Sequence, residues 1–324
     1  MIRQYEKKKI IAAVIIIVAA VVANIFPAFK ICDRISMYVN ILLCLLIDFL
    51  GVYCLRNIET LFRVPLEIYR SRDIFWDLAK NDFQARFVGS VFGVFWAFVN
   101  PVITLLLYWF VFQVGLRAGN VGDYPFILFL MSGLIPWFYI QEALNGGASS
   151  LLEYTYLVKK MVFNVEILPV LKVVSTLFVH VFFIGILLIV ACAYGIDISL
   201  YTLQIFYYIF CSAFFILGVS YFTAASTAFF KDMTQIINIV LVIGTWVTPI
   251  MWNAEKTLPP VLLGFFRLNP FYYIVDGFRD AVLFKKWFWD KPVWTAYFWI
   301  VAIVVYIGGV KFFNRLKVHF SDVL

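Results

Sequence analysis

Long apolar runs alternate with short polar segments along nearly the whole chain. A helix of about 20 apolar residues crosses the hydrocarbon core of a bilayer and satisfies its own backbone hydrogen bonds there. Because most of the runs reach that length, the pattern predicts an all-α polytopic membrane protein. We expect eight spanning helices, over residues 10–29, 36–55, 93–115, 124–147, 169–194, 201–230, 235–252 and 292–310.

Basic residues set the expected orientation. Arg3 and the run 7–9 precede the first apolar stretch, and positive charge is retained on the cytoplasmic side of a membrane. An even number of spans returns the chain to that side, so the basic tail 311–324 is also expected there. The sequence therefore predicts a multi-pass protein of the cytoplasmic (inner) membrane with both termini in the cytoplasm.

The charged stretch before the third span has the period of an amphipathic helix over residues 71–88. Its spacing also makes Asp82 and Arg86 available as an ion pair one turn apart. We expect this helix to lie on the inner membrane surface, with a polar face that is either solvated or in contact with a partner. The apolar stripe consists of Trp76, Ala79, Phe83 and Phe87, and the polar face consists of Asp73, Asp77, Lys80 and Gln84.

A second amphipathic element interrupts the spans, within residues 149–172. At helical spacing, Glu153, Tyr156, Lys160 and Asn164 share one face, and Leu151, Thr155, Val158 and Val162 share the other. Pro169 is suited to the first turn of the next helix. The pattern predicts a short helix in the membrane plane, which is either a docking surface for a soluble partner or an ordinary interfacial loop.

Residues 253–292 are too apolar for a free loop and too broken for a span. The runs 258–266 and 271–284 are each too short to cross a bilayer, and Asn269 with Pro270 separates them. We expect two short helices that enter the outer leaflet and return. Because a buried arginine is costly in a membrane, Arg279 should lie near the surface or pair with Asp276 or Asp280.

Composition supports the membrane assignment and narrows the function. Hydrophobic residues make up 64% of the chain and charged residues 14%, and mean hydropathy is +0.94. The net charge of +7 is expected to orient the chain against membrane lipid rather than to bind nucleic acid. No phosphate-binding loop, zinc motif or nucleophile elbow occurs, and the two histidines, His180 and His319, are isolated. We therefore expect no catalytic residue, no metal site and no cofactor bound by this chain.

Residues 128–175 carry a run of motifs in a characteristic order. The chain resembles the permeases of ABC-2-type polysaccharide exporters, which include O-antigen, teichoic acid and capsule exporters. Further matches are 71–101, 230–232, Thr248 with Pro249, Asn269 with Pro270, 277–279 and the tail from Phe320, whereas the two front helices are additional to the six-helix family core. The central motifs are Gly133 to Trp137, Gly146 to Ser150, Lys159 with Lys160, Phe163, and Ile167 to Pro169.

The resemblance implies a transport half-unit with an ABC-2 exporter fold. Residues 1–62 would be a two-helix membrane extension and 63–324 the transmembrane domain, with an interface helix at 71–88, a coupling helix at 149–164 and re-entrant outer helices at 258–284. Two copies of the chain would pair, and two copies of an ABC ATPase subunit carrying ATP and Mg would dock beneath them. The implied docking residues are Glu153, Tyr154, Tyr156, Lys159, Lys160, Arg72 and Asp73.

The implied cargo is a lipid-linked glycan. Aromatic residues make up 20% of the chain, and sugar rings present apolar faces on which aromatic side chains stack. Two other functions stay open, namely an exporter of a drug or small lipid and a membrane-embedded glycan-modifying enzyme. The candidates for lining or gating a pore are Tyr108, Trp109, Phe112, Tyr272, Tyr273 and Arg279.

Overall fold

The computed structural model describes residues 34–160 and 164–324, together with residue 13. Within this part of the chain the regular structure is helical, and the only β pairing is an isolated bridge between Val121 and Tyr124. The prediction of an all-α polytopic membrane protein is confirmed. Apart from residue 13, the first predicted span, 10–29, lies outside the described residues.

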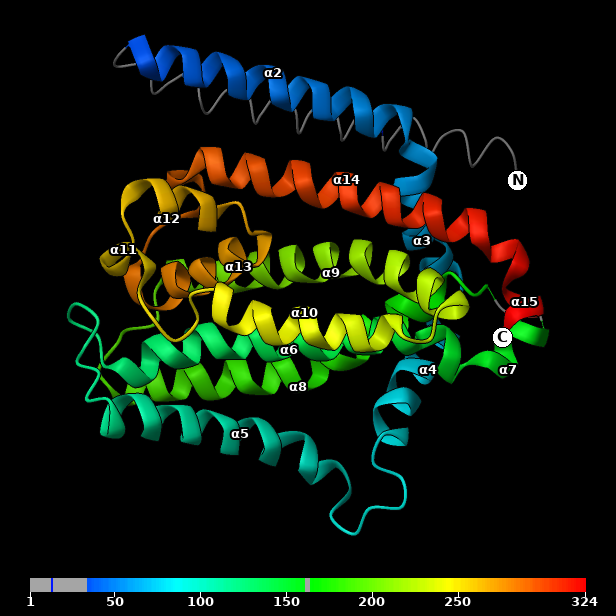
Figure 1. The fold of residues 1–324 in the computed structure, drawn as a ribbon, viewed down its shortest axis with the longest axis horizontal. Coiled ribbons are helices and arrows are strands. Elements are labelled where there is room, and N and C mark those ends of the chain that lie inside the picture. Colours follow the sequence, from blue (N-terminus) through cyan, green and yellow to red (C-terminus); the bar gives the residue numbers. More distant parts are fainter. Residues whose placement is uncertain (1–12, 14–33, 161–163) are drawn as a thin grey trace.

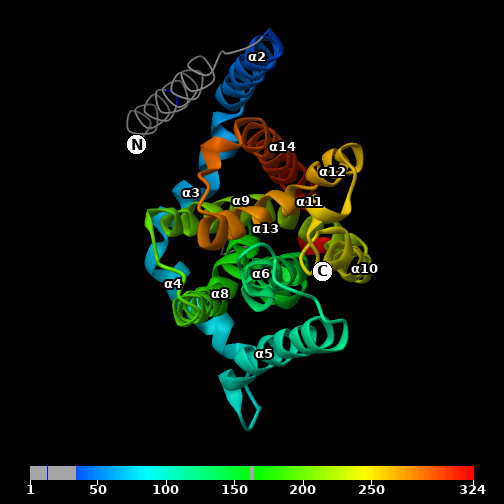
Figure 2. The ribbon, with the colours of Figure 1, turned by 90° about the vertical axis from the view of Figure 1, so that its left-hand side faces the viewer.

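Three long helices form the centre of the bundle: α6 (Phe126–Glu153), α8 (Ile167–Ala193) and α9 (Gln204–Phe229). The helix α14 (Pro292–Leu316) packs along α9, and α10 (Met233–Val247) packs against α6. The outer helices α2 (Arg34–Arg56) and α5 (Trp96–Trp109) lie on opposite sides of this bundle, as Figures 1 and 2 show.

In the described residues, five helical stretches are long and apolar enough to cross a membrane. They cover Gly93–Gly115, Phe126–Glu153, Ile167–Ala193, Leu200–Phe229 and Pro292–Val323. The first contains α5 between a 3₁₀ turn (Gly93–Phe95) and a π-helical turn (Phe110–Gly115). With the shorter α10 they form a core of six helices. α10 ends earlier than predicted because Thr248 is extended and Pro249 follows it.

Small residues allow the central helices to approach closely. A Cβ on Gly309 of α14 would lie 2.2 Å from the carbonyl oxygen of Gly218 in α9, and one on Gly147 of α6 would lie 2.2 Å from Ser220 Oγ in α9. Only glycine fits at such crossings. This packing also explains why α6 continues to Glu153: the small-residue stretch that precedes it stays helical against its neighbours.

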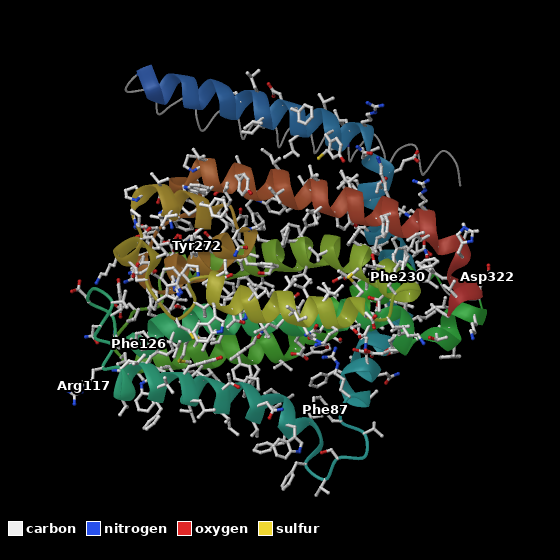
Figure 3. All side chains as sticks on the ribbon, viewed as in Figure 1. Phe87, Arg117, Phe126, Phe230, Tyr272 and Asp322 are labelled. Carbon is white, nitrogen blue, oxygen red and sulfur yellow. The ribbon has the colours of Figure 1, made fainter. Side chains whose placement is uncertain are left out.

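The two ends of the bundle carry different elements (Figure 1). One end, called the α7 end, holds α3 (Ile58–Arg70), α4 (Arg72–Ala85), α7 (Thr155–Lys160) and α15 (Phe320–Val323). The opposite α12 end holds α11 (Ala254–Thr257), α12 (Pro260–Arg267) and α13 (Pro270–Arg279), which continues as a π-helical turn over Asp280–Phe284. In Figure 3, Phe230 and Asp322 mark the α7 end, and Arg117 and Tyr272 mark the other.

Several predicted boundaries shift. The expected boundary after residue 62 falls inside α3, and α4 directly follows α3 after a turn at Ser71. The stretch 149–164, expected as one short helix, is divided between the end of α6 and the six-residue α7. The predicted helices at 258–266 and 271–284 correspond closely to α12 and to α13 with its π turn.

Candidate functional site

The short helix α7 presents one buried face and one exposed face. Val158 is 3% exposed and packs with Leu151 of α6, as the helical spacing predicts. Tyr156 is 62% exposed, and Lys159 is exposed as well. Lys160 ends the helix, and its side chain lies outside the described residues. The part of α7 whose side chains are described therefore presents Tyr156 and Lys159 at the surface.

Two of the predicted docking residues, Glu153 and Tyr154, also bind neighbouring helices, and the Glu153 side chain is still 49% exposed. The carboxylate of Glu153 accepts hydrogen bonds from Lys172 of α8 and from Ser149. The hydroxyl of Tyr154 donates to Asp82 Oδ1 of α4 at 2.7 Å. These contacts hold the base of α7 against α4 and α8, so Glu153 and Tyr154 position α7.

Asp82 is the centre of this arrangement. Its side chain is 3% exposed, and so is that of Lys172, whose Nζ lies 2.5 Å from Asp82 Oδ1. Ser175 Oγ donates to Asp82 Oδ2 at 2.6 Å, and Arg86 Nη2 lies 3.0 Å from the same oxygen. The predicted Asp82–Arg86 pair is confirmed. Arg86 also forms an ion pair with Glu142 of α6, so the network joins α4, α6 and α8.

The network fixes the charge of Asp82. Burial alone raises the pKa of a carboxyl group, but hydrogen bonds from Lys172, Ser175 and Tyr154 and the charge of Lys172 outweigh it and hold the pKa of Asp82 below its ordinary value. Burial and the bond to Asp82 raise the pKa of the Tyr154 hydroxyl. Asp82 is therefore an anion at neutral pH, as a buried carboxylate needs to be if it is to bind two cations.

The apolar stripe predicted for this helix is partly wrong. The buried residues of α4 are Phe75, Ala79 and Asp82, whereas Trp76 is 47% exposed. The predicted polar residues Asp73, Asp77, Lys80 and Gln84 are exposed. Arg72 and Asp73 lie in the first turn of α4, exposed and 3.6 Å apart. The buried face of α4 includes Asp82 because the cationic partners of this carboxylate lie in the bundle.

At the α12 end, Arg279 is buried and does not form the predicted ion pair. Its Nη1 and Nη2 donate to the carbonyl oxygens of Pro249 and Ile250 at 2.8 and 2.6 Å, and its guanidinium lies 3.7 Å from the ring centre of Phe129. Asp276 and Asp280 instead bind Lys291, at 2.6 and 2.5 Å. The break after α10 exposes carbonyl oxygens that no helical amide reaches, and Arg279 satisfies them.

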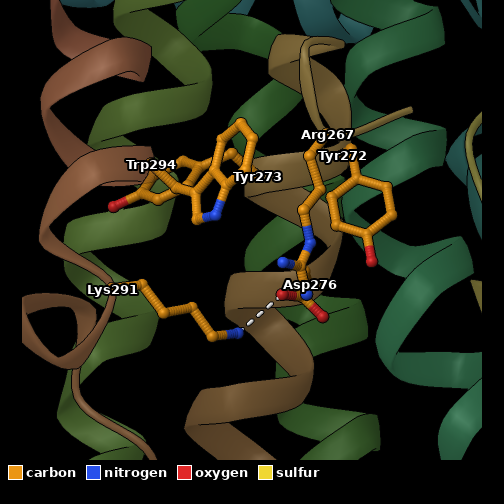
Figure 4. A pocket seen from close by; sticks show the side chains of 6 residues that line it. All are labelled: Arg267, Tyr272, Tyr273, Asp276, Lys291 and Trp294. Atoms are coloured by element: carbon orange, nitrogen blue, oxygen red, sulfur yellow. Dashed lines mark hydrogen bonds and ion pairs between the residues drawn. The ribbon is translucent and has the colours of Figure 1, made fainter. Parts of the chain in front are cut away.

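A small pocket lies beside this cluster (Figure 4). Tyr272 and Tyr273 line it, and the hydroxyl of Tyr273 shares hydrogen bonds with Tyr207 and Thr295. Arg267 stacks over Trp294, with 5.6 Å between the guanidinium and the ring centre. The other lining residues are Asp276 and Lys291. The pocket therefore brings charged groups together with aromatic rings.

The other pore candidates lie on α5 and the turn that follows it. Tyr108, Trp109 and Phe112 are partly buried against the core, and Phe112 stacks on Phe126 of α6 with ring centres 6.1 Å apart. The rest of this span is largely exposed. Their role at a pore stays a prediction.

The isolated histidine of α8 is a packed residue. His180 is buried and stacks on Tyr139 with ring centres 4.6 Å apart. Across the described part of the chain, no group of three or more metal-binding side chains comes together.

A family model described as "ABC-2 type transporter" matches residues 74–283, which is more than half of the chain. The chain belongs to the ABC-2 type transporter family. The matched region runs from α4 to the π turn after α13, so it contains the Asp82 network, α7 and Arg279. It excludes α2 and α3, which precede it.

Curated relatives agree with this assignment. The chain is 29% identical over 266 residues to "O-antigen export system permease protein RfbA" of Myxococcus xanthus, covering 81% of this chain and 99% of the relative. A protein of the same name from Klebsiella pneumoniae is 24% identical over 253 residues, covering 78% and 95%. "Inner membrane transport permease YadH" of Escherichia coli (strain K12) is 26% identical over 224 residues, covering 64% and 82%.

Sequence reasoning missed three residues that organise the α7 end: Glu142, Lys172 and Ser175. Lys172 carried a signal, because a lysine inside an apolar run of membrane length requires a partner. That partner, Asp82, is 90 positions away. At the α12 end, Lys291 had a similar signal, since two nearby carboxylates needed a cation.

Proposed function

We propose that this chain is the transmembrane subunit of an ATP-driven transporter that exports a lipid-linked polysaccharide of the O-antigen, teichoic acid or capsular type across the cytoplasmic membrane. The observation that carries the proposal is the match to O-antigen export permeases over nearly their whole length. The chain would supply the passage and no catalysis, because ATP and Mg would be bound by a separate subunit.

In this proposal the α7 end faces the cytoplasm and both termini lie there. Two copies of the chain pair, and two ATPase subunits dock beneath them on the exposed face of α7, through Tyr156, Lys159 and Lys160. The Asp82 network supports this role, since a docking helix transmits force only if its base is fixed to the spanning helices. Arg72 and Asp73 would contribute from the start of α4.

The glycan would pass between the two copies. Outward-facing apolar residues on α5 and α10 leave surface for the second copy and for lipid. Tyr108, Trp109 and Phe112 would contribute aromatic rings near the α12 end of α5, and Tyr272 and Tyr273 would line the exit held in place by Arg279.

A second candidate is export of a drug or a small lipid. The relative named only as an inner membrane transport permease, which matches a smaller share of the chain, leaves it open. A membrane-embedded glycan-modifying enzyme is the third candidate.

Co-purification tests these alternatives. The chain is co-expressed with a candidate ATPase subunit, the complex is reconstituted in nanodiscs, and bound lipids are identified by mass spectrometry. We expect a complex with two copies of each subunit, ATP hydrolysis stimulated by the permease, and a bound lipid-linked oligosaccharide. A small lipid or drug in its place would support the second candidate, and transport by the purified chain without an ATPase would refute the proposal.

A further inference from the structure

The helix α3 packs on the core beside the segment that carries α7. Its residue Val64 is 2% exposed and belongs to one hydrophobic cluster with Val158 of α7, Leu168 of α8 and Phe313 of α14. α3 precedes the region that matches the family model. The Myxococcus relative is covered over 99% of its length by 81% of this chain, so this chain has segments that the relative lacks.

A buried carboxylate links α3 to the segment between α7 and α8. Glu166, the residue before α8, is 1% exposed. Its Oε1 lies 2.8 Å from a guanidinium nitrogen of Arg63 in α3 and 3.0 Å from Nζ of Lys317 after α14. A buried carboxylate stays charged only with such partners. Arg63 is 52% exposed and reaches inward from the surface to provide one of them.

The backbone around Glu166 is held as well. Tyr221 of α9 donates its hydroxyl hydrogen to the carbonyl oxygen of Glu166 at 2.8 Å. Lys317 Nζ also donates to Asn164 Oδ1 at 3.1 Å. Three other elements, α3, α9 and the turn after α14, therefore converge on residues 164–166. Only residues 161–165 separate Glu166 from α7.

We propose that Arg63 is a positioning residue for the docking helix, so that α3 forms part of the coupling machinery. If Arg63 is absent, Glu166 keeps a single cation, and its Oε2 has no hydrogen-bond partner in the structure. Moving the segment toward water then lowers its free energy, because water solvates the carboxylate of Glu166. As a result, α7 loses its fixed position. The inference rests on the proposed function, in which α7 binds the ATPase.

The test uses the full chain in nanodiscs, first without and then with the ATPase subunit. The variants are Arg63→Gln, Arg63→Lys, Glu166→Gln and the double Arg63→Gln/Glu166→Gln. The matched control is Arg70→Gln, since Arg70 lies on the same helix, is 55% exposed and forms an ion pair with Glu67 at 3.9 Å. Melting temperature identifies any variant that fails to fold, and Arg63→Lys keeps the charge if Arg63→Gln is unstable.

Without the ATPase, hydrogen exchange of the α7 amides is measured. We expect Arg63→Gln to accelerate exchange at least about fivefold, as the loss of one charged hydrogen bond implies, while Arg63→Lys and Arg70→Gln stay near the wild-type rate. The double variant should exchange no faster than Arg63→Gln, because both changes break the same contact. Equal α7 exchange in Arg63→Gln and Arg70→Gln would overturn the inference.

With the ATPase, the steady-state kinetics of ATP hydrolysis are measured. We expect Arg63→Gln to lower the permease-stimulated kcat about fivefold with KM for ATP unchanged, because the nucleotide site lies on the other subunit. Altered α7 exchange with wild-type stimulation would show that Arg63 acts only on structure and would refute its coupling role. If the wild-type chain itself stimulates no ATPase, the proposed function fails, whereas the exchange result still decides whether Arg63 positions α7.

Discussion

Gly133 of α6 lies directly against Arg279 of α13. A Cβ on Gly133 would come within 2.8 Å of Arg279 Nη2 and 3.0 Å of the carbonyl oxygen of Ile250, which Arg279 binds. The absence of a side chain at 133 thus leaves room for the guanidinium that closes the break after α10. Two motifs that lie far apart in the sequence, around Gly133 and Arg279, form one contact.

Substituting either partner should loosen the α12 end. We expect Gly133→Ala and Arg279→Ala each to lower the free energy of unfolding by about 1–3 kcal/mol, because the carbonyl oxygens of Pro249 and Ile250 lose their donors, and to reduce export. Gly185→Ala is the control, since its added methyl meets nothing within 4 Å. Thermal unfolding and an export assay measure the effects, and wild-type export by Arg279→Ala would show that the contact is dispensable.

Removing Lys172 should be among the most damaging changes at the α7 end. Lys172→Met leaves the charge of Asp82 buried without its nearest cation. Breaking a buried ion pair in this way costs about 3–5 kcal/mol. The double variant Asp82→Asn/Lys172→Met removes both charges and should recover a large part of that loss. Unfolding of the purified chain tests this, and a double variant less stable than Lys172→Met would contradict the assigned pairing.

The crossing of α9 and α14 should tolerate no side chain at Gly309. Gly309→Ala places a methyl group against the backbone of Gly218, which cannot move aside, so we expect a loss of about 1–3 kcal/mol. Its neighbour Gly308 faces open space, and Gly308→Ala should be neutral or stabilising by up to about 1 kcal/mol. Melting temperatures of the two variants are measured side by side. Gly309→Ala should lower the melting temperature, whereas Gly308→Ala should leave it unchanged or raise it.

Charge reversal on α7 should weaken docking without disturbing insertion. We expect Lys159→Glu with Lys160→Glu to reduce recovery of the ATPase complex and permease-stimulated hydrolysis by about tenfold, a coupling change of roughly 1.4 kcal/mol. Arg117→Glu, an exposed change at the opposite end, is the matched control. If coupling in the double variant equals that of Arg117→Glu, the ATPase does not dock on these lysines.

Hydropathy predicted most of the fold because spanning helices need only length and apolar character. The helices 93–115, 167–193 and 200–229 lie within two residues of their predicted bounds. The end of α6 was missed because the stretch with Gly146 and Gly147 looks like a turn in isolation. Its helical state depends on close packing against Ser220 of α9, which is distant in sequence.

The candidate site was harder to predict because its charges pair across the bundle. The Asp82–Arg86 pair is local and was found, whereas the partner of Lys172 lies on another helix. The partners of Arg279 were predicted wrongly for a related reason. Its acceptors are backbone carbonyl oxygens, and every residue has one, so the sequence does not show which of them bind the guanidinium. A pattern along one helix shows that a charge needs a partner, and only the packing shows which one.

The helix α6 carries both Phe129, beneath Arg279, and Glu153, which binds Lys172. At about 1.5 Å per residue, these two contacts are roughly 36 Å apart along a single rod. A straight, rigid helix transmits a tilt of its Glu153 end to its Phe129 end. Pro136, the one residue of α6 without an amide hydrogen, marks the point where such a tilt would turn into a bend.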